Sequence, residues 1–327
     1  MTRTSFLFII PLFIIGFSSC VKKELPVPAH QSGDVTTSTV DMDASYKYQV
    51  YYNLKTNTVI GQNLKTIWDI GLETSPAGYH IVLNASKSMF ALNTGKTDFA
   101  SVSYTDTSGF GVNRKWDEAS GNMDSTAIGD WRGTNKVFII DRGFNEKGQG
   151  QGYEKLQLLS VNDNAYTMHF AALNGTGDTT ITVTKDSAFN LSFISFSTKQ
   201  QLQVEPPKAN WDLAFSQYTY IFYDQVPVLP YLVTGCLLNR YNTEAAPDTN
   251  NRFTQLTYSD VSNYILSRDI STIGYQWKTF NGSSYTVNTN YSYIIRSAEG
   301  IYYKLRFTGF YNNAGAKGNP KWEYQRL

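Results

Sequence analysis

Histidines are the side chains of this 327-residue sequence best suited to bind a metal, and there are three of them. His80 and His169 lie in apolar alternating stretches, whereas His30 lies in a polar segment near the N-terminus and belongs to no fixed site. His80 shares a strand face with Val82 and Asn84, and His169 shares one with Thr167 and Ala171, so either imidazole could coordinate a metal or face solvent. Since neither face consists entirely of large apolar residues, the sequence favours exposure of both imidazoles to solvent.

Two aspartates form a second candidate pair. Asp69 and Asp212 each follow a tryptophan in two similar stretches, residues 66–72 and 209–215. Facing each other across a cleft, they could act as acid and base. An aspartate that follows a core tryptophan and precedes Gly or Ala is better suited to accept hydrogen bonds from a loop or an arginine, so we expect a structural role. The candidate arginines are Arg142, Arg240 and Arg296.

Catalytic sequence motifs are missing. Gly95-Lys96-Thr97 resembles the end of a phosphate-binding loop, but Phe90 occupies the position of the first glycine. The sequence has no Gly-x-Ser-x-Gly, His-Glu-x-x-His or Cys-x-x-Cys. Cys236 lies in an apolar run and is expected to be a small buried residue, with neither a catalytic role nor a disulfide. We therefore expect a protein that is not an enzyme and forms no disulfide-linked oligomer.

The N-terminus has the pattern of a lipoprotein signal. Residues 1–19 contain one basic residue and an apolar run that is shorter than the ~20 residues of a membrane span, and Cys20 follows. Gly16-Phe17-Ser18-Ser19-Cys20 resembles the bacterial signal in which the cysteine is acylated, and an ordinary signal peptide with an incidental cysteine is the alternative. Residues 20–40 are rich in Lys, Pro, Ser and Thr and predict a flexible tether. These features predict lipidation at Cys20 and anchoring to a membrane.

The composition and the spacing of turn residues favour β-strands in the rest of the chain, after the N-terminal signal and tether. Aromatic residues make up 15%, helical periodicity is scarce, and Asn-Gly-type turns separate alternating apolar runs. The net charge of +1 argues against a nucleic-acid partner, which would require a basic face. We predict an all-β fold with many antiparallel strands.

The chain contains an internal repeat. The two Trp-Asp stretches are 143 residues apart, and four further pairs of matching segments follow in the same order, among them Val82-Leu83-Asn84 with Leu237-Leu238-Asn239. We predict two tandem, related, antiparallel β-sandwich-like repeats, at residues 41–185 and 186–327.

These features resemble the HmuY family, the haem-binding surface lipoproteins of the Bacteroidetes. The residues that carry the resemblance are Cys20, Asp43-Ala44-Ser45, Tyr51-Tyr52-Asn53-Leu54, Trp68-Asp69, Val82-Leu83-Asn84, Ile294-Ile295-Arg296, Lys304-Leu305-Arg306-Phe307 and Tyr311. Family members typically have one such unit, so this chain resembles an extended form with two. The resemblance implies an all-β fold, an outer-membrane or cell-surface location, and capture of haem or a related porphyrin for a TonB-dependent outer-membrane receptor.

The resemblance does not supply the residues that would bind haem iron. Founding members use two histidines in loops of a single domain, and this sequence has no histidine at the matching positions. His80 and His169 are therefore the candidate haem ligands, with Met89, Met123 and Met168 as further possible donors. The alternative is a glycan-binding or protein-interaction module without a haem site, because a surface protein with 23 Tyr and 6 Trp can present aromatic platforms to sugars.

Overall fold

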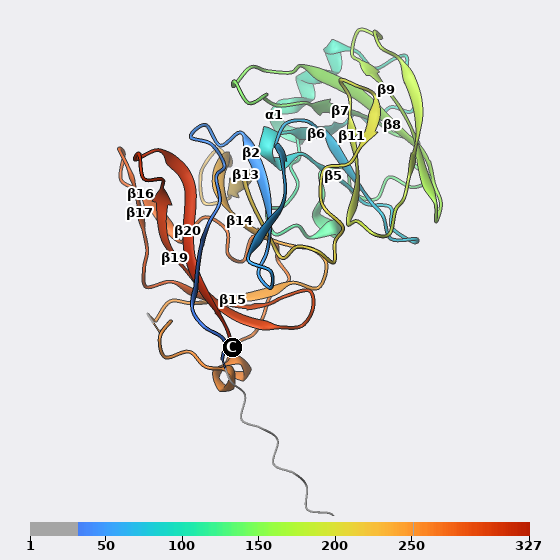
Figure 1. Cartoon of the computed structure of the whole chain (residues 1–327). Helices are drawn as coiled ribbons and strands as arrows, with labels where there is room; N and C mark the ends of the chain where they lie inside the picture. The colour runs from blue at the N-terminus through green and yellow to red at the C-terminus, as the bar shows by residue number, and fades with distance from the viewer. Residues whose placement is uncertain (1–31, 251) are drawn as a thin grey trace, which may run out of the picture. The chain divides into compact units, whose positions relative to one another are not determined.

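The computed structural model describes residues 32–250 and 252–327 (Figure 1). Cys20, the expected signal segment and most of the expected tether lie outside these residues. Residues 32–327 form one compact unit that contains two β-sandwiches. We call residues 65–204 the first sandwich, and residues 32–64 together with 205–327 the second sandwich.

The first sandwich consists of two antiparallel sheets. The four-stranded sheet has the order β12-β11-β4-β5, and the five-stranded sheet has the order β10-β9-β8-β7-β6. The strands are β4 (Ile70–Glu73), β5 (Ile81–Leu83), β6 (Phe90–Asn93), β7 (Val137–Asp141), β8 (Tyr153–Val161), β9 (Ala165–Ala172), β10 (Thr179–Thr184), β11 (Leu191–Ser195) and β12 (Gln200–Leu202).

The second sandwich repeats this plan. Its sheets have the orders β14-β13-β2-β3 and β1-β20-β19-β18-β15, and β16 and β17 form a separate hairpin. The strands are β1 (Thr36–Thr39), β2 (Tyr48–Asn53), β3 (Thr58–Leu64), β13 (Leu213–Phe222), β14 (Leu229–Leu238), β15 (Glu244–Asp248), β16 (Lys278–Phe280), β17 (Tyr285–Val287), β18 (Ser292–Arg296), β19 (Tyr302–Tyr311) and β20 (Lys317–Arg326).

Helical segments are short and lie in the connections. They are η1 (Ala85–Lys87), η2 (Tyr104–Gly109), α1 (Phe110–Asn113), η3 (Met123–Ser125) and η4 (Tyr258–Asn263). Among residues 32–250 and 252–327, no helix has the length and hydropathy needed to cross a membrane.

Alternating side chains fill both cores. On β9, Tyr166, Met168 and Phe170 are at most 1% exposed and pack in the first core with residues from both of its sheets. The second core contains a corresponding set from both of its sheets, including Phe215, Phe307 and Trp322. Burial of each such side chain contributes about 1.5–3 kcal/mol. The predicted all-β fold of two related sandwiches is confirmed.

The strands that precede the two Trp-Asp stretches are exchanged between the sandwiches. β1, β2 and β3 precede the first Trp-Asp stretch, yet they pair within the second sandwich; β10, β11 and β12 precede the second Trp-Asp stretch, yet they belong to the first. The registers match, because Tyr52 lies opposite Leu213 on β13 just as Ile194 lies opposite Ile70 on β4. A repeat boundary near residue 185 falls within the first sandwich, between β10 and β11, so it does not coincide with the boundary between the sandwiches. The ranges 41–185 and 186–327 remain predictions about the repeat.

Both tryptophans of the Trp-Asp stretches occupy equivalent surroundings. Trp68 packs edge-on against Phe193 at 4.8 Å between ring centroids, and Trp211 packs edge-on against Tyr51 at 4.9 Å. Strict alternation along residues 66–72 predicts that Trp68 shares a face with the core residues Ile70 and Leu72, and the corresponding prediction holds for Trp211; the structure shows that both predictions are wrong. β4 and β13 begin two residues after the tryptophan, so the alternation does not extend back to it, and the indole lies with the small residue Gly71 or Ala214 on the opposite face.

Candidate functional site

A surface cleft with a volume of about 580 Å³ lies between the two sandwiches. One wall comes from residues 111–126 of the first sandwich, and the other comes from the β13–β14 hairpin of the second. The lining residues are Gly111, Val112, Arg114, Lys115, Trp116, Glu118, Asp124, Ser125, Thr126, Ile221, Tyr223, Pro227 and Val228.

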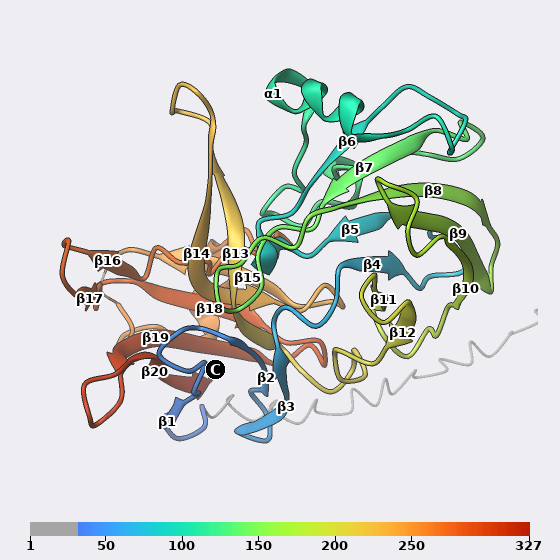
Figure 2. The ribbon, with the colours of Figure 1, turned by 90° about the horizontal axis from the view of Figure 1, so that it is seen from above.

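The hairpin wall is a long antiparallel ribbon that ends in apolar residues. β13 and β14 pair continuously from Leu213–Leu238 to Phe222–Leu229, and their tip projects from the sheet beside α1 (Figure 2). Val226 at the tip is 99% exposed and Tyr223 is 61% exposed. Exposed apolar groups gathered at a turn, where polar residues are usual, indicate a binding surface.

The opposite wall presents aromatic and cationic groups. The main chain of Lys115 exchanges hydrogen bonds of 2.8 and 2.9 Å with Ala91 on β6, and this pairing attaches the wall to the edge of the five-stranded sheet. The Arg114 guanidinium lies 4.9 Å from the centre of the Trp116 ring. Val112, in α1, is 90% exposed. The wall therefore combines an indole, an apolar side chain, two positive charges and the carboxylates of Glu118 and Asp124.

One hydrogen bond joins the two walls. The Tyr223 hydroxyl on the hairpin donates to the Glu118 carboxylate on the opposite wall. Partial burial, followed by this bond, raises the pKa of Tyr223 to about 12. The phenol is therefore neutral and positioned at neutral pH.

His80 lies next to the cleft but does not line it. Its Nδ1 is 2.5 Å from Glu73 Oε2, its Nε2 is 3.4 Å from Asp124 Oδ1, and its ring stacks on Tyr79. Asp124 is a lining residue, so His80 is separated from the cleft by a carboxylate. The imidazole is mostly buried, which differs from the expected exposure to solvent.

His169 lies on β9, away from the cleft lining. Its Nε2 is 2.7 Å from Asp178, and its ring stacks on Phe99 with 3.7 Å between centroids. His80 and His169 share no contact partner, and neither lines a described pocket. Their assignment as haem ligands remains a prediction. In the described ranges, no group of three or more His, Cys, Asp or Glu side chains could hold a metal ion.

The three methionines considered as haem ligands also lie outside the cleft lining. Met89 and Met168 are buried in the first core, and Met123 is half-buried, with its Sδ 3.4 Å from Arg240 Nη1. None of the three lines the cleft.

The two Trp-Asp carboxylates have structural roles. Asp69 is 1% exposed and accepts hydrogen bonds from the Phe196 N–H at 2.7 Å, from Arg142 at 3.3 Å and from the buried Lys87 ammonium. Of the three arginines considered, Arg142 is therefore the partner of Asp69. Asp212 accepts from the main-chain N–H of Leu54 at 2.8 Å.

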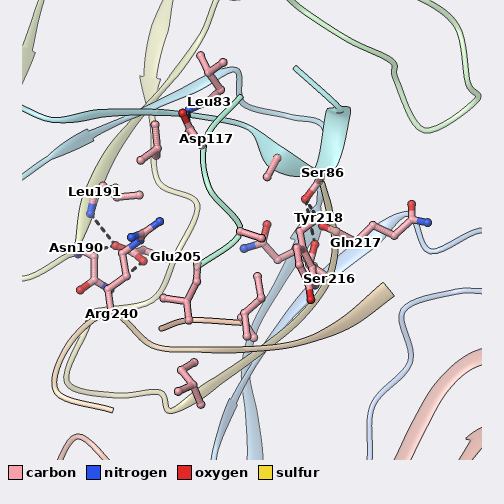
Figure 3. Close-up of a pocket in the computed structure, with 18 of the residues that line it drawn as sticks. Leu83, Ser86, Asp117, Asn190, Leu191, Glu205, Ser216, Gln217, Tyr218 and Arg240 are labelled. Carbon is pink, nitrogen blue, oxygen red and sulfur yellow. Dashed lines mark hydrogen bonds between the residues drawn. The ribbon is translucent and has the colours of Figure 1, made fainter. Parts of the chain in front are cut away.

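A second hollow, with a volume of about 130 Å³, lies between the small-residue faces of the two Trp-Asp strands (Figure 3). Glu205 lies on its wall close to Arg240 and accepts the N–H groups of Asn190 at 2.5 Å and Leu191 at 2.9 Å. Burial raises the pKa of Glu205 to about 7.

The cleft was not predicted from the sequence. The sequence does contain a signal for it, because Tyr223, Val226 and Val228 are large apolar residues within what is otherwise a turn between two strands. Trp116 and Arg114 carry no such signal, since they approach the hairpin only through the pairing of the two sandwiches.

Comparison with known proteins yields one family match. The family model described as HmuY protein matches residues 45–186 and 233–324. No curated protein matches the sequence.

Three solved structures are similar at low identity. Apo PinO from Porphyromonas gingivitis is 11% identical, with 90% of this chain and 97% of that chain covered and a TM-score of 0.27. A chain named as a HmuY-like heme binding protein from Bacteroides vulgatus is 13% identical, with 89% and 90% covered and a TM-score of 0.20. The apo HmuY analog from Tannerella forsythia is 9% identical, with 91% and 99% covered and a TM-score of 0.25.

Proposed function

This chain belongs to the HmuY family, whose model matches more than half of its length, and from this premise we propose that it captures haem or a related porphyrin in the cleft between the two sandwiches. The observation that carries the proposal is the cleft itself. Its volume of about 580 Å³ lies within the range of about 300–1,000 Å³ that is usual for small-molecule sites.

The chemistry of the cleft fits a porphyrin. A porphyrin is a flat, apolar macrocycle with two carboxylates at one edge. Trp116 and Tyr223 offer rings for stacking, and Ile221, Pro227 and Val228 offer apolar contacts. Arg114 and Lys115 supply positive charges for the two carboxylates. The second hollow, at about 130 Å³, lies well below this range and is not proposed as the porphyrin site.

Binding to the purified protein tests the proposal. Addition of haemin or metal-free protoporphyrin IX should change the porphyrin absorbance and quench tryptophan fluorescence, with saturation at one equivalent. The variant Val112→Glu places a carboxylate on an exposed part of the wall and should weaken binding by about tenfold or more, because the macrocycle would have to desolvate it. Ile265→Glu is the matched control, since Ile265 is 96% exposed and does not line the cleft.

Two results would count against the proposal. One is the absence of any spectral change with either porphyrin. The other is equal porphyrin affinity in the wild type, Val112→Glu and Ile265→Glu, which would place the site elsewhere. Hits on a glycan array together with no porphyrin binding would favour the glycan-binding alternative.

The location and partner form a further part of the proposal. We propose that Cys20 is acylated, that the protein is anchored in the outer membrane or at the cell surface, and that it passes the porphyrin to a TonB-dependent receptor. The support is the sequence pattern before Cys20 and the family membership. Metabolic labelling with a fatty-acid analogue should modify the wild type and leave Cys20→Ser unmodified; labelling of both would contradict acylation at Cys20.

A further inference from the structure

We propose that Tyr223 binds the iron of a captured ferric haem through its phenolate oxygen and that Glu118 accepts the phenolic proton. This inference rests on the proposed porphyrin function and assigns the axial ligand that the family resemblance left open.

The first argument is the set of residue types in the cleft. Proteins hold haem iron through His, Cys, Met or Tyr. Among the thirteen described residues that line the cleft, Tyr223 is the one member of these four types. His80 lies behind Asp124, His169 lines no described pocket, and Cys236 is fully buried.

The second argument is the position of the phenol. Tyr223 is 61% exposed although its hydroxyl is bonded, so its ring stands at the surface of the cleft and its oxygen is fixed by one acceptor. The acceptor, Glu118, belongs to the other sandwich. A macrocycle that enters the cleft therefore meets an oxygen donor whose hydroxyl already points to a carboxylate that can accept its proton when the iron binds.

Proton and charge balance without a redox reagent. On haem binding, the O–H bond of Tyr223 would break, its proton would move to a Glu118 carboxylate oxygen, and the phenolate oxygen would replace the water molecule bound to Fe(III) in free ferric haem. The iron remains ferric throughout. The proton-transfer step is local, because donor and acceptor are already hydrogen-bonded.

Tyr223→Phe separates iron ligation from porphyrin binding, because phenylalanine keeps the ring and loses the oxygen. We expect this variant to bind metal-free protoporphyrin IX within about twofold of the wild type and to bind haemin about tenfold or more weakly. The phenolate-to-iron charge-transfer absorption and the resonance Raman bands of bound phenolate should be present in the wild type and missing in Tyr223→Phe.

Two further variants sharpen the test. Tyr231→Phe changes an exposed tyrosine of the same hairpin outside the cleft lining and should retain the wild-type spectrum. Glu118→Gln keeps a hydrogen-bond acceptor but is a much poorer base, so it should lower haemin affinity with little effect on the metal-free porphyrin.

The outcomes are distinguishable. If metal-free protoporphyrin binds and Tyr223→Phe retains the wild-type haemin spectrum and affinity, the ligand assignment is overturned while the proposed function stands. If neither porphyrin binds, both fail. Loss of the phenolate signature in Tyr223→Phe alone supports the assignment.

Discussion

Asp69 and Asp212 occupy equivalent positions in the two sandwiches and hold the same strand in each. The Asp69 carboxylate accepts the N–H of Phe196, which follows β11, and the Asp212 carboxylate accepts the N–H of Leu54, which follows β2. Each carboxylate thus fastens the end of an exchanged strand to the strand beside it. The charged partners differ, because Lys87 and Arg142 contact Asp69.

This difference predicts unequal costs for the same substitution. Asp69→Asn leaves the Lys87 ammonium, which is 0% exposed, without its anion and should lower the free energy of unfolding by about 3–5 kcal/mol. Asp212→Asn weakens main-chain hydrogen bonds only and should cost about 1–2 kcal/mol. Urea unfolding of the two variants measures both values, and equal losses would contradict the assigned role of Lys87.

The raised pKa of Glu205 predicts that the stability of the fold depends on pH. Because its pKa is raised from 4.5 to about 7 in the folded protein, the unfolded chain ionises first as pH rises, and the folded state loses stability between these values. The loss should amount to about 3 kcal/mol by pH ~8 relative to pH ~4. Glu205→Gln should remove this part of the pH profile, whereas the exposed control Glu299→Gln should retain it. A profile that Glu205→Gln leaves unchanged would rule out this origin.

The positive charges of the cleft predict a dependence on the porphyrin carboxylates. Arg114→Ala and Lys115→Ala should each weaken protoporphyrin binding by about three- to tenfold, and more at low salt than at high salt. Protoporphyrin dimethyl ester, which lacks the carboxylates, should bind all three proteins alike. Lys136→Ala, outside the lining, is the matched control. Equal effects on acid and ester would mean that these side chains act by packing.

The burial of Cys236 predicts that its thiol reacts only when the protein unfolds. It is 0% exposed, and burial raises its pKa well above the usual value. A thiol reagent added to the native protein should therefore modify it slowly, and denaturant should expose one reactive group in the described chain. Rapid labelling under native conditions would show that β14 opens readily.

Local patterns predicted much of the fold. The repeated Trp-Asp stretch, the alternation at Ile70 and Leu72, and the apolar run around Cys236 each depend on neighbours in the sequence, and the structure confirms the strands and cores they indicated. The faces of Trp68 and Trp211 could not be predicted in the same way, because a strand start shifts the alternation and no local residue marks it.

The cleft depends on contacts that the sequence does not encode locally. Trp116 and Tyr223 are more than a hundred residues apart and line one hollow only because the two sandwiches are paired. The exchange of β1–β3 with β10–β12 was likewise not predicted, because the alternation within a strand does not say which sheet the strand joins. Which sheet a strand joins is decided by the lengths of the connections and by specific side-chain contacts. The periodicity of the sequence does not reveal either of these.

The strand exchange has a mechanical consequence for ligand capture. The chain crosses between the sandwiches twice, near residues 64–65 and again near residues 204–205. Two covalent connections restrict hinge rotation more than a single linker would, so we expect the two walls of the cleft to keep their spacing when a ligand enters.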